Sequence, residues 1–156
     1  MKKVLTALFV LTMLLFAACG NDVPSVDLSQ ITFDGVTVGD DFNKIETEKY
    51  TPSDRYPESE NLYAFEEWRV RVDGDLITEI TASYPLIDIS VNGKKDCFAL
   101  EDVTNILGDG YVSSWYDREQ SLMQIEYADK ENALKCAFVY DKNGGNLVFA
   151  IMQKTP

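Results

Sequence analysis

Alternation of apolar and polar residues is the feature of this sequence that most limits its fold. Apolar side chains recur at every second position in residues 68–72, 80–84, 87–91, 123–127 and 134–140. A period of two places one face of a β-strand on a core and the other toward solvent. Asp73-Gly74-Asp75 and Asn143-Gly144-Gly145-Asn146 favour tight hairpin turns, because glycine accepts the positive φ that such turns need. The sequence therefore predicts a mainly antiparallel sheet.

Short helices are expected beside these strands. One apolar stripe predicts a helix over residues 100–107, with Gly108 at its C-terminal end. The stripe consists of Leu100, Val103, Ile106 and Leu107. A shorter helix of at most two turns is expected after Gly39, with Asp40 or Asp41 as its N-cap. The predicted fold class is thus α+β, an antiparallel sheet with short helices packed on one face.

The two halves of the chain repeat one order of elements. In the first half, a strand that includes residues 31–35 is followed by a short helix and then by further strands. The second half has the same order, beginning with a strand that includes residues 89–93. This echo predicts two tandem helix-plus-meander units, residues 30–85 and 86–154, within a domain that spans residues 30–156. Chance similarity between two α+β halves is the alternative.

The first twenty residues have the pattern of a secretory signal peptide. Lys2 and Lys3 precede an apolar run that is shorter than the roughly 20 residues needed to span a bilayer. The run ends in Phe16-Ala17-Ala18-Cys19, which resembles the lipobox of bacterial lipoproteins. That resemblance implies cleavage before Cys19 and a diacylglyceryl lipid on its sulfur. Ordinary secretion with an unmodified Cys19 is the alternative.

Lipidation at Cys19 would fix where the protein works. We expect residues 1–18 to be a lipoprotein signal peptide and residues 19–29 a lipidated tether. Each buried methylene contributes roughly 0.8 kcal/mol, so two or three acyl chains anchor firmly where one is marginal. The expected location is the bacterial cell envelope, on the extracytoplasmic side of a membrane.

Charge and composition exclude several classes of function. The chain has 26 acidic against 14 basic residues and no histidine, for a net charge of −12. Such a chain repels phosphate backbones, so we expect no nucleic-acid binding. Without histidine there is no imidazole base and no histidine-ligated metal. Acidic pairs such as Asp40/Asp41 and Glu66/Glu67 would need a deep cleft for glycoside chemistry, for which a chain this short has little room. We expect no enzyme, no cofactor and no metal.

Two cysteines remain besides Cys19. Cys97 precedes the helix expected over 100–107, and Cys136 lies on the apolar side of a strand. If that helix packs on that strand, the two sulfurs meet, and an oxidising compartment would favour a disulfide between them. Two separate buried thiols are the alternative.

Aromatic residues are the remaining candidates for a binding surface, because tyrosine and tryptophan are favoured at protein interfaces. The candidates are Tyr56, Tyr63, Trp68, Trp115 and Tyr116. Their two clusters follow the two expected helices, so in a tandem fold they would line one concave surface. The surrounding carboxylates suit a basic partner. For each single aromatic, a place in the core is the alternative.

The order of elements resembles a known family. Two copies of a helix and a meander, each entered through an Ile-x-x-x-Gly strand and with Ile106-Leu107-Gly108 ending the second helix, are similar to the tandem units of β-lactamase inhibitory protein and its lipoprotein relatives. A single unit resembles the small lipoprotein of the outer-membrane barrel-assembly machine. The resemblance implies an α+β sheet whose face or edge binds another protein without catalysis.

The sequence thus predicts a membrane-anchored extracytoplasmic lipoprotein that acts as a non-catalytic protein-binding or envelope-associated module. The alternative is a lipoprotein that binds a small ligand, namely a cation, a sugar or a peptide, through the aromatic loop near Tyr56 and its neighbouring carboxylates. An exposed aromatic patch on a sheet favours the first function, and an enclosed pocket favours the second.

Overall fold

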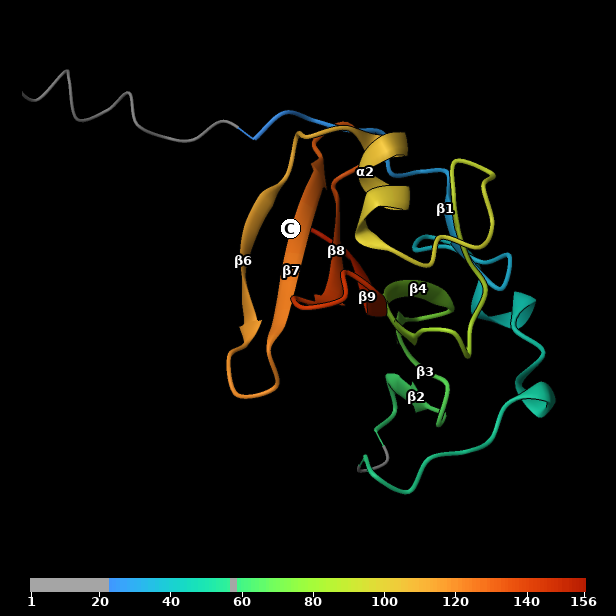
Figure 1. Ribbon diagram of the computed structural model, residues 1–156. Coiled ribbons are helices and arrows are strands. Elements are labelled where there is room, and N and C mark those ends of the chain that lie inside the picture. Colours follow the sequence, from blue (N-terminus) through green and yellow to red (C-terminus); the bar gives the residue numbers. More distant parts are fainter. Residues whose placement is uncertain (1–22, 57–58) are drawn as a thin grey trace, which may run out of the picture.

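The computed structural model describes residues 23–56 and 59–156 (Figure 1). The strands are β1 (Ile31–Phe33), β2 (Leu62–Ala64), β3 (Trp68–Asp73), β4 (Leu76–Ser83), β5 (Ile89–Val91), β6 (Val112–Asp117), β7 (Leu122–Asp129), β8 (Leu134–Asp141) and β9 (Leu147–Lys154). The α-helix is α2 (Leu100–Leu107). Seven strands form one antiparallel sheet in the order β2-β3-β4-β9-β8-β7-β6, and β1 pairs with β5 in a separate ribbon.

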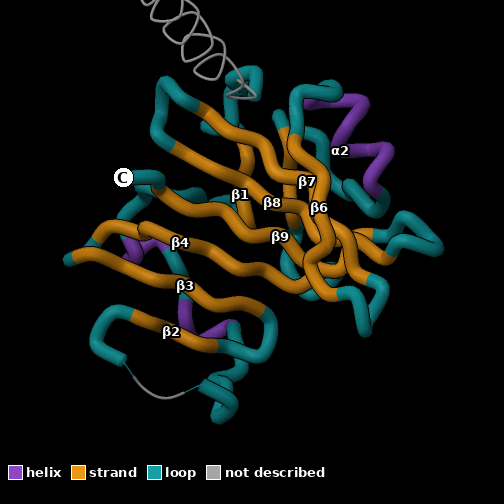
Figure 2. Tube along the Cα trace, turned by 90° about the vertical axis from the view of Figure 1, so that its left-hand side faces the viewer, coloured by secondary structure: helices purple, strands orange, loops and turns teal. Residues whose placement is uncertain are grey.

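The last strands of the two halves, β4 and β9, pair with each other inside the large sheet (Figure 2). Thr81 lies opposite Ile151, and Ala82 lies opposite Ala150. β1 and β5, which come early in each half, also pair, with Ile31 opposite Val91. The ribbon thus pairs strands far apart in the sequence, and the β4–β9 pairing joins two meanders of consecutive strands into the large sheet.

The hydrophobic core lies on one face of the large sheet, where α2 and the β1–β5 ribbon pack against it (Figure 1). The expected alternation is realised in β3, where every second side chain from Trp68 to Val72 is buried and Arg71 between them is exposed. α2 contributes Val103 and Leu107 to the core. Burial of these apolar side chains is the main term that favours folding.

The predicted α+β class is wrong. The structure is mainly antiparallel β-sheet, and α2 is its single α-helix among the described residues. The helix expected over residues 100–107 is confirmed, with Gly108 following it at a positive φ of 78°. The Asp102 carboxylate accepts hydrogen bonds from the backbone N–H groups of Phe98 and Ala99, which satisfies donors at the start of this helix.

The helix expected after Gly39 does not form as an α-helix. Two three-residue 3₁₀ turns stand there instead, η1 (Phe42–Lys44) and η2 (Thr47–Lys49). Ile45 ends the first turn in an extended conformation, which buries its side chain in the core. The first half therefore has no α-helix among its described residues, and the description as two helix-plus-meander units does not hold for it.

Residues 25–28 are held against the β7–β8 hairpin. The Val26 N–H donates to the Ala128 carbonyl at 2.9 Å, and the Leu28 N–H donates to the Asp129 carboxylate at 3.0 Å. Leu28 is fully buried. The later part of the predicted tether thus belongs to the folded body, whereas the predicted signal peptide and Cys19 lie outside the described residues. No helix within residues 23–56 and 59–156 has the length and apolar character needed to cross a membrane.

Candidate functional site

The large sheet has one face that neither α2 nor the β1–β5 ribbon covers, although the edge strand β6 curls toward β9 on this side (Figure 2). Arg69, Thr81 and Ile151 follow one another across β3, β4 and β9 on this face, because they are cross-strand neighbours. Ser83 and Phe149 form the next row. The residues that alternate with them contribute to the core on the opposite face. We call this side of the sheet the uncovered face.

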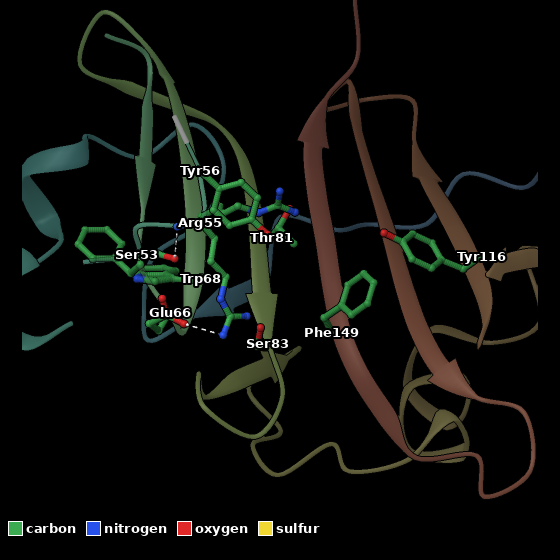
Figure 3. Close-up of a pocket in the computed structure, with 11 residues that line it drawn as sticks. Ser53, Arg55, Tyr56, Glu66, Trp68, Thr81, Ser83, Tyr116 and Phe149 are labelled. Carbon is green, nitrogen blue, oxygen red and sulfur yellow. Dashed lines mark hydrogen bonds and ion pairs between the residues drawn. The ribbon is translucent and has the colours of Figure 1, made fainter. Parts of the chain in front are cut away.

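A depression of about 240 Å³ lies on the uncovered face (Figure 3). The loop before β2 and the strand β3 form one side of it, and β9 with the edge strand β6 forms the other. Hydroxyl groups from β4 lie between the two sides. Its lining includes the side chains of Tyr56, Arg69, Thr81, Ser83, Tyr116 and Phe149.

Two aromatic rings form the β6–β9 side of the depression. The rings of Tyr116 and Phe149 meet edge to face, with centroids 5.0 Å apart and an angle of 76° between their planes. Tyr116 sits where the β6–β7 register shifts, between Trp115 and Asp117, and such an irregularity bends an edge strand. β6 thereby brings an exposed tyrosine from the sheet edge toward β9, although β8 and β7 lie between these two strands in the sheet.

Arginine side chains lie on the opposite side. The Arg69 guanidinium lies 4.6 Å from the centroid of the Tyr56 ring. Arg55 lies within 3.4 Å of the Glu66 carboxylate, an ion pair that is open to solvent. Stacking on an aromatic face is favourable for a guanidinium and restricts its orientation. The depression therefore combines aromatic walls, hydroxyl groups, the Arg55–Glu66 ion pair and the guanidinium of Arg69.

The structure brings together two of the five aromatic residues proposed from the sequence. Tyr56 and Tyr116, which are 37% and 46% exposed, line the same depression from opposite sides. Trp68 also borders it, but this side chain is 2% exposed and belongs to the core. A role for these residues in binding stays a prediction.

The other two aromatic residues lie elsewhere. Tyr63 stacks on Phe42, with centroids 3.9 Å apart. Trp115 lies under the Lys142 ammonium, which is 4.6 Å from its ring centroid, and pairs with Met123 across the sheet. Met123 lies on the same face of β7 as the buried Ile125, so its partner Trp115 projects from the face opposite to the depression. These two residues do not contribute to the depression.

Sequence reasoning missed Arg69, Thr81 and Phe149. Each occupies a polar or outward position in an alternating strand, so the sequence pattern could have predicted that its side chain points away from the core. The pattern contains no signal for the pairing of β4 with β9, which makes Thr81 and Phe149 neighbours on the uncovered face.

Cys97 and Cys136 are both buried and both free thiols in the structure, which is the second of the two alternatives for this pair. The Cys97 thiol donates to the Lys94 carbonyl at 3.6 Å. Burial raises the pKa of both thiols, because a thiolate loses its hydration in the protein interior. Raised pKa values make these cysteines poor nucleophiles. Within the described parts of the chain, no three acidic or cysteine side chains come together as a metal site.

No protein-family model matches the sequence, and no curated protein matches it either. Among solved structures, the chain is similar to a cysteine-rich secretory protein from Staphylococcus aureus, with 14% sequence identity and a TM-score of 0.43. The similarity covers 79% of this chain and 45% of that protein, so this chain corresponds to less than half of its length.

Proposed function

We propose that this chain is a lipid-anchored protein of the bacterial cell envelope that binds a segment of another protein on its uncovered face, without catalysing a reaction. The observation that carries the proposal is the grouping of the exposed Tyr56 and Tyr116 with the half-buried Phe149 around one depression on this sheet face. Exposed aromatic groups that gather on one surface are typical of protein interfaces.

The size of the depression favours a protein segment over a free small ligand. Pockets for drug-sized ligands hold about 300–1,000 Å³ and bury most of the ligand surface. The depression measures about 240 Å³ and opens onto the sheet. A space of this size accommodates one or two side chains of a partner whose backbone runs over the face. Binding of a small cation, sugar or peptide remains the alternative function.

The lipid anchor is supported by the sequence alone. Phe16-Ala17-Ala18-Cys19 at the end of the apolar run supplies the lipobox-like pattern. Cys19→Ser removes the sulfur that would be acylated. In bacterial cells fed labelled palmitate, we expect label on the wild-type chain and none on the variant, which should also leave the membrane fraction. A wild-type chain without label refutes the anchor.

Crosslinking in living cells, followed by pull-down of the full chain, tests the binding function. Ile151→Lys places a charge in the middle of the uncovered face and should abolish capture of the wild-type partner. Leu86→Lys is the matched control, because Leu86 is an exposed apolar residue of a second patch beside Phe98, outside the depression. Equal unfolding temperatures of the two variants show that the fold is intact. If Leu86→Lys loses capture and Ile151→Lys does not, the interface lies at the second patch, which contradicts the proposal.

A further inference from the structure

We propose that the depression on the uncovered face binds a carboxylate group presented by the partner segment, with Arg69 as the residue that holds it. The inference rests on the proposed function and names the chemistry of the segment, an acidic side chain next to an apolar one. It differs from the prediction of a basic partner, which follows from the net charge of the whole chain and not from the charge of this site.

Arg69 has no carboxylate partner among the described residues, although the chain has 26 acidic side chains. The chain has four arginines. Arg55 pairs with Glu66 at 3.4 Å, and Arg71 lies 3.8 Å from Glu79. Arg69 is partly buried and makes its contact with the Tyr56 ring instead. A half-buried guanidinium that is not neutralised in so acidic a protein leaves its charge and its N–H donors for a ligand.

The groups around Arg69 suit a carboxylate. A guanidinium stacked on an aromatic ring presents a planar fork of N–H donors, which matches the two oxygens of a carboxylate. Thr81 lies directly across from Arg69 in the strand pairing, and Ser83 follows two residues later. Neither hydroxyl is engaged in a hydrogen bond with the described residues, so both remain as donors beside the guanidinium. Converging donors of this kind fix the orientation of an anionic group.

The opposite side of the depression favours an apolar residue next to the acidic residue of the partner segment. Tyr116 and Phe149 form an aromatic wall, and Ile151 adds an aliphatic side chain beside Thr81. An apolar residue adjacent to the carboxylate would bury its surface there. Because the whole chain has a net charge of −12, a segment with several acidic groups would be repelled by the remaining surface. The structure thus assigns a single carboxylate in an apolar context.

Binding of the full chain to an array of short peptides tests this assignment. Each peptide has a central Glu, Gln, Lys or phosphoserine between apolar neighbours that vary across the array. We expect the central Glu to bind about 10- to 100-fold more tightly than the matched Gln, as for a charged hydrogen bond. Arg69→Gln should remove this preference. Arg118→Gln should keep it, because Arg118 stacks on Trp115 away from the depression.

The outcomes separate this inference from the proposed function. Equal binding of Glu and Gln, a preference for Lys or phosphoserine, or an unchanged Glu preference in Arg69→Gln each overturns the carboxylate assignment. In these cases the proposed function still stands if Ile151→Lys abolishes capture of the cellular partner. If no peptide binds and Ile151→Lys captures the cellular partner as well as the wild type does, both the carboxylate assignment and the proposed function are wrong.

Discussion

The ring of Tyr116 on the edge strand β6 packs edge-on against the ring of Phe149 on β9, with 5.0 Å between the centroids. This contact defines one side of the depression on the uncovered face. Tyr116→Ala should therefore weaken partner binding by about tenfold or more, since tyrosine is one of the residue types enriched among the few interface positions that contribute most to affinity. The measurement is the dissociation constant of the isolated partner for variant and wild type.

Trp115→Ala is the control for Tyr116→Ala, because it removes a comparably exposed aromatic ring from the preceding position in the same strand. Its side chain contacts Lys142 on the other face of the sheet. We expect its affinity for the partner to stay within about twofold of wild type. A larger loss with Trp115→Ala than with Tyr116→Ala would place the interface on the wrong face for this account.

Asp129 should be among the most important polar side chains for stability. It is 3% exposed, and its carboxylate accepts hydrogen bonds from Leu28, Glu131 and Asn132. Asp129→Ala leaves these N–H groups without an acceptor and should lower the free energy of unfolding by about 2–3 kcal/mol, measured in urea. Asp117→Ala, which removes a similar turn carboxylate at a more exposed site, should cost less than half as much. Equal losses would refute the special role of Asp129.

The same carboxylate predicts a pH dependence of stability. Burial alone would raise the pKa of Asp129, but the hydrogen bonds from Asn132, Leu28 and Glu131 outweigh it and hold the pKa below the usual value. A depressed pKa means that the stabilisation is complete above the unfolded value of about 3.9 and is lost as the pH falls through the lower folded value. Asp129→Asn should flatten the acid limb of a stability profile between about pH 5 and pH 2. An unchanged acid limb would contradict this.

Tyr50 links the turn after β1 to the core. Its hydroxyl donates to the Asp34 carboxylate at 2.8 Å, and its ring lies 4.9 Å from that of Trp68. Tyr50→Phe keeps the ring and should reduce the free energy of unfolding by about 1 kcal/mol. Tyr63→Phe is the matched control, because the Tyr63 ring stacks on Phe42 without a hydrogen bond from its hydroxyl to the described residues. A neutral Tyr50→Phe would show that the Asp34 bond adds nothing.

The buried thiols of Cys97 and Cys136 should resist alkylation in the folded protein. Burial raises the pKa of each thiol, so little thiolate is present at pH 8. Intact mass after treatment with iodoacetamide should show neither residue modified in buffer and both modified in urea without reductant. If neither residue is alkylated in urea until reductant is added, the two cysteines are joined by a disulfide, which contradicts this prediction of two free thiols.

The sequence predicted most strands and the α-helix, because both are set by local periodicity. Alternating residues located β3, β7 and β8, and the stripe from Leu100 to Leu107 located α2. The short region after Gly39 offered only one turn of apolar residues, so packing of Ile45 in an extended conformation decided its structure. This override of a weak helix pattern by the core is the reason why the α+β class was wrong.

The candidate site was only partly predictable. Tyr56 and Tyr116 were identified by residue type, since exposed tyrosines suit interfaces. Phe149 becomes a neighbour of Tyr116 through the register shift in β6. The pairing of β4 with β9 then brings this aromatic pair to the same face as Arg69, which stacks on Tyr56. Long-range pairing depends on tertiary packing and leaves no local pattern in a sequence.

Site-specific photocrosslinking shows whether a protein partner occupies the uncovered face. A photoreactive phenylalanine analogue replaces either Phe149 in the depression or Trp115 on the other face, in the full chain expressed in its own cells. We predict a discrete crosslinked product from position 149 on irradiation and none from position 115. A product from position 115 alone, or no product from position 149 in repeated trials, would contradict the account.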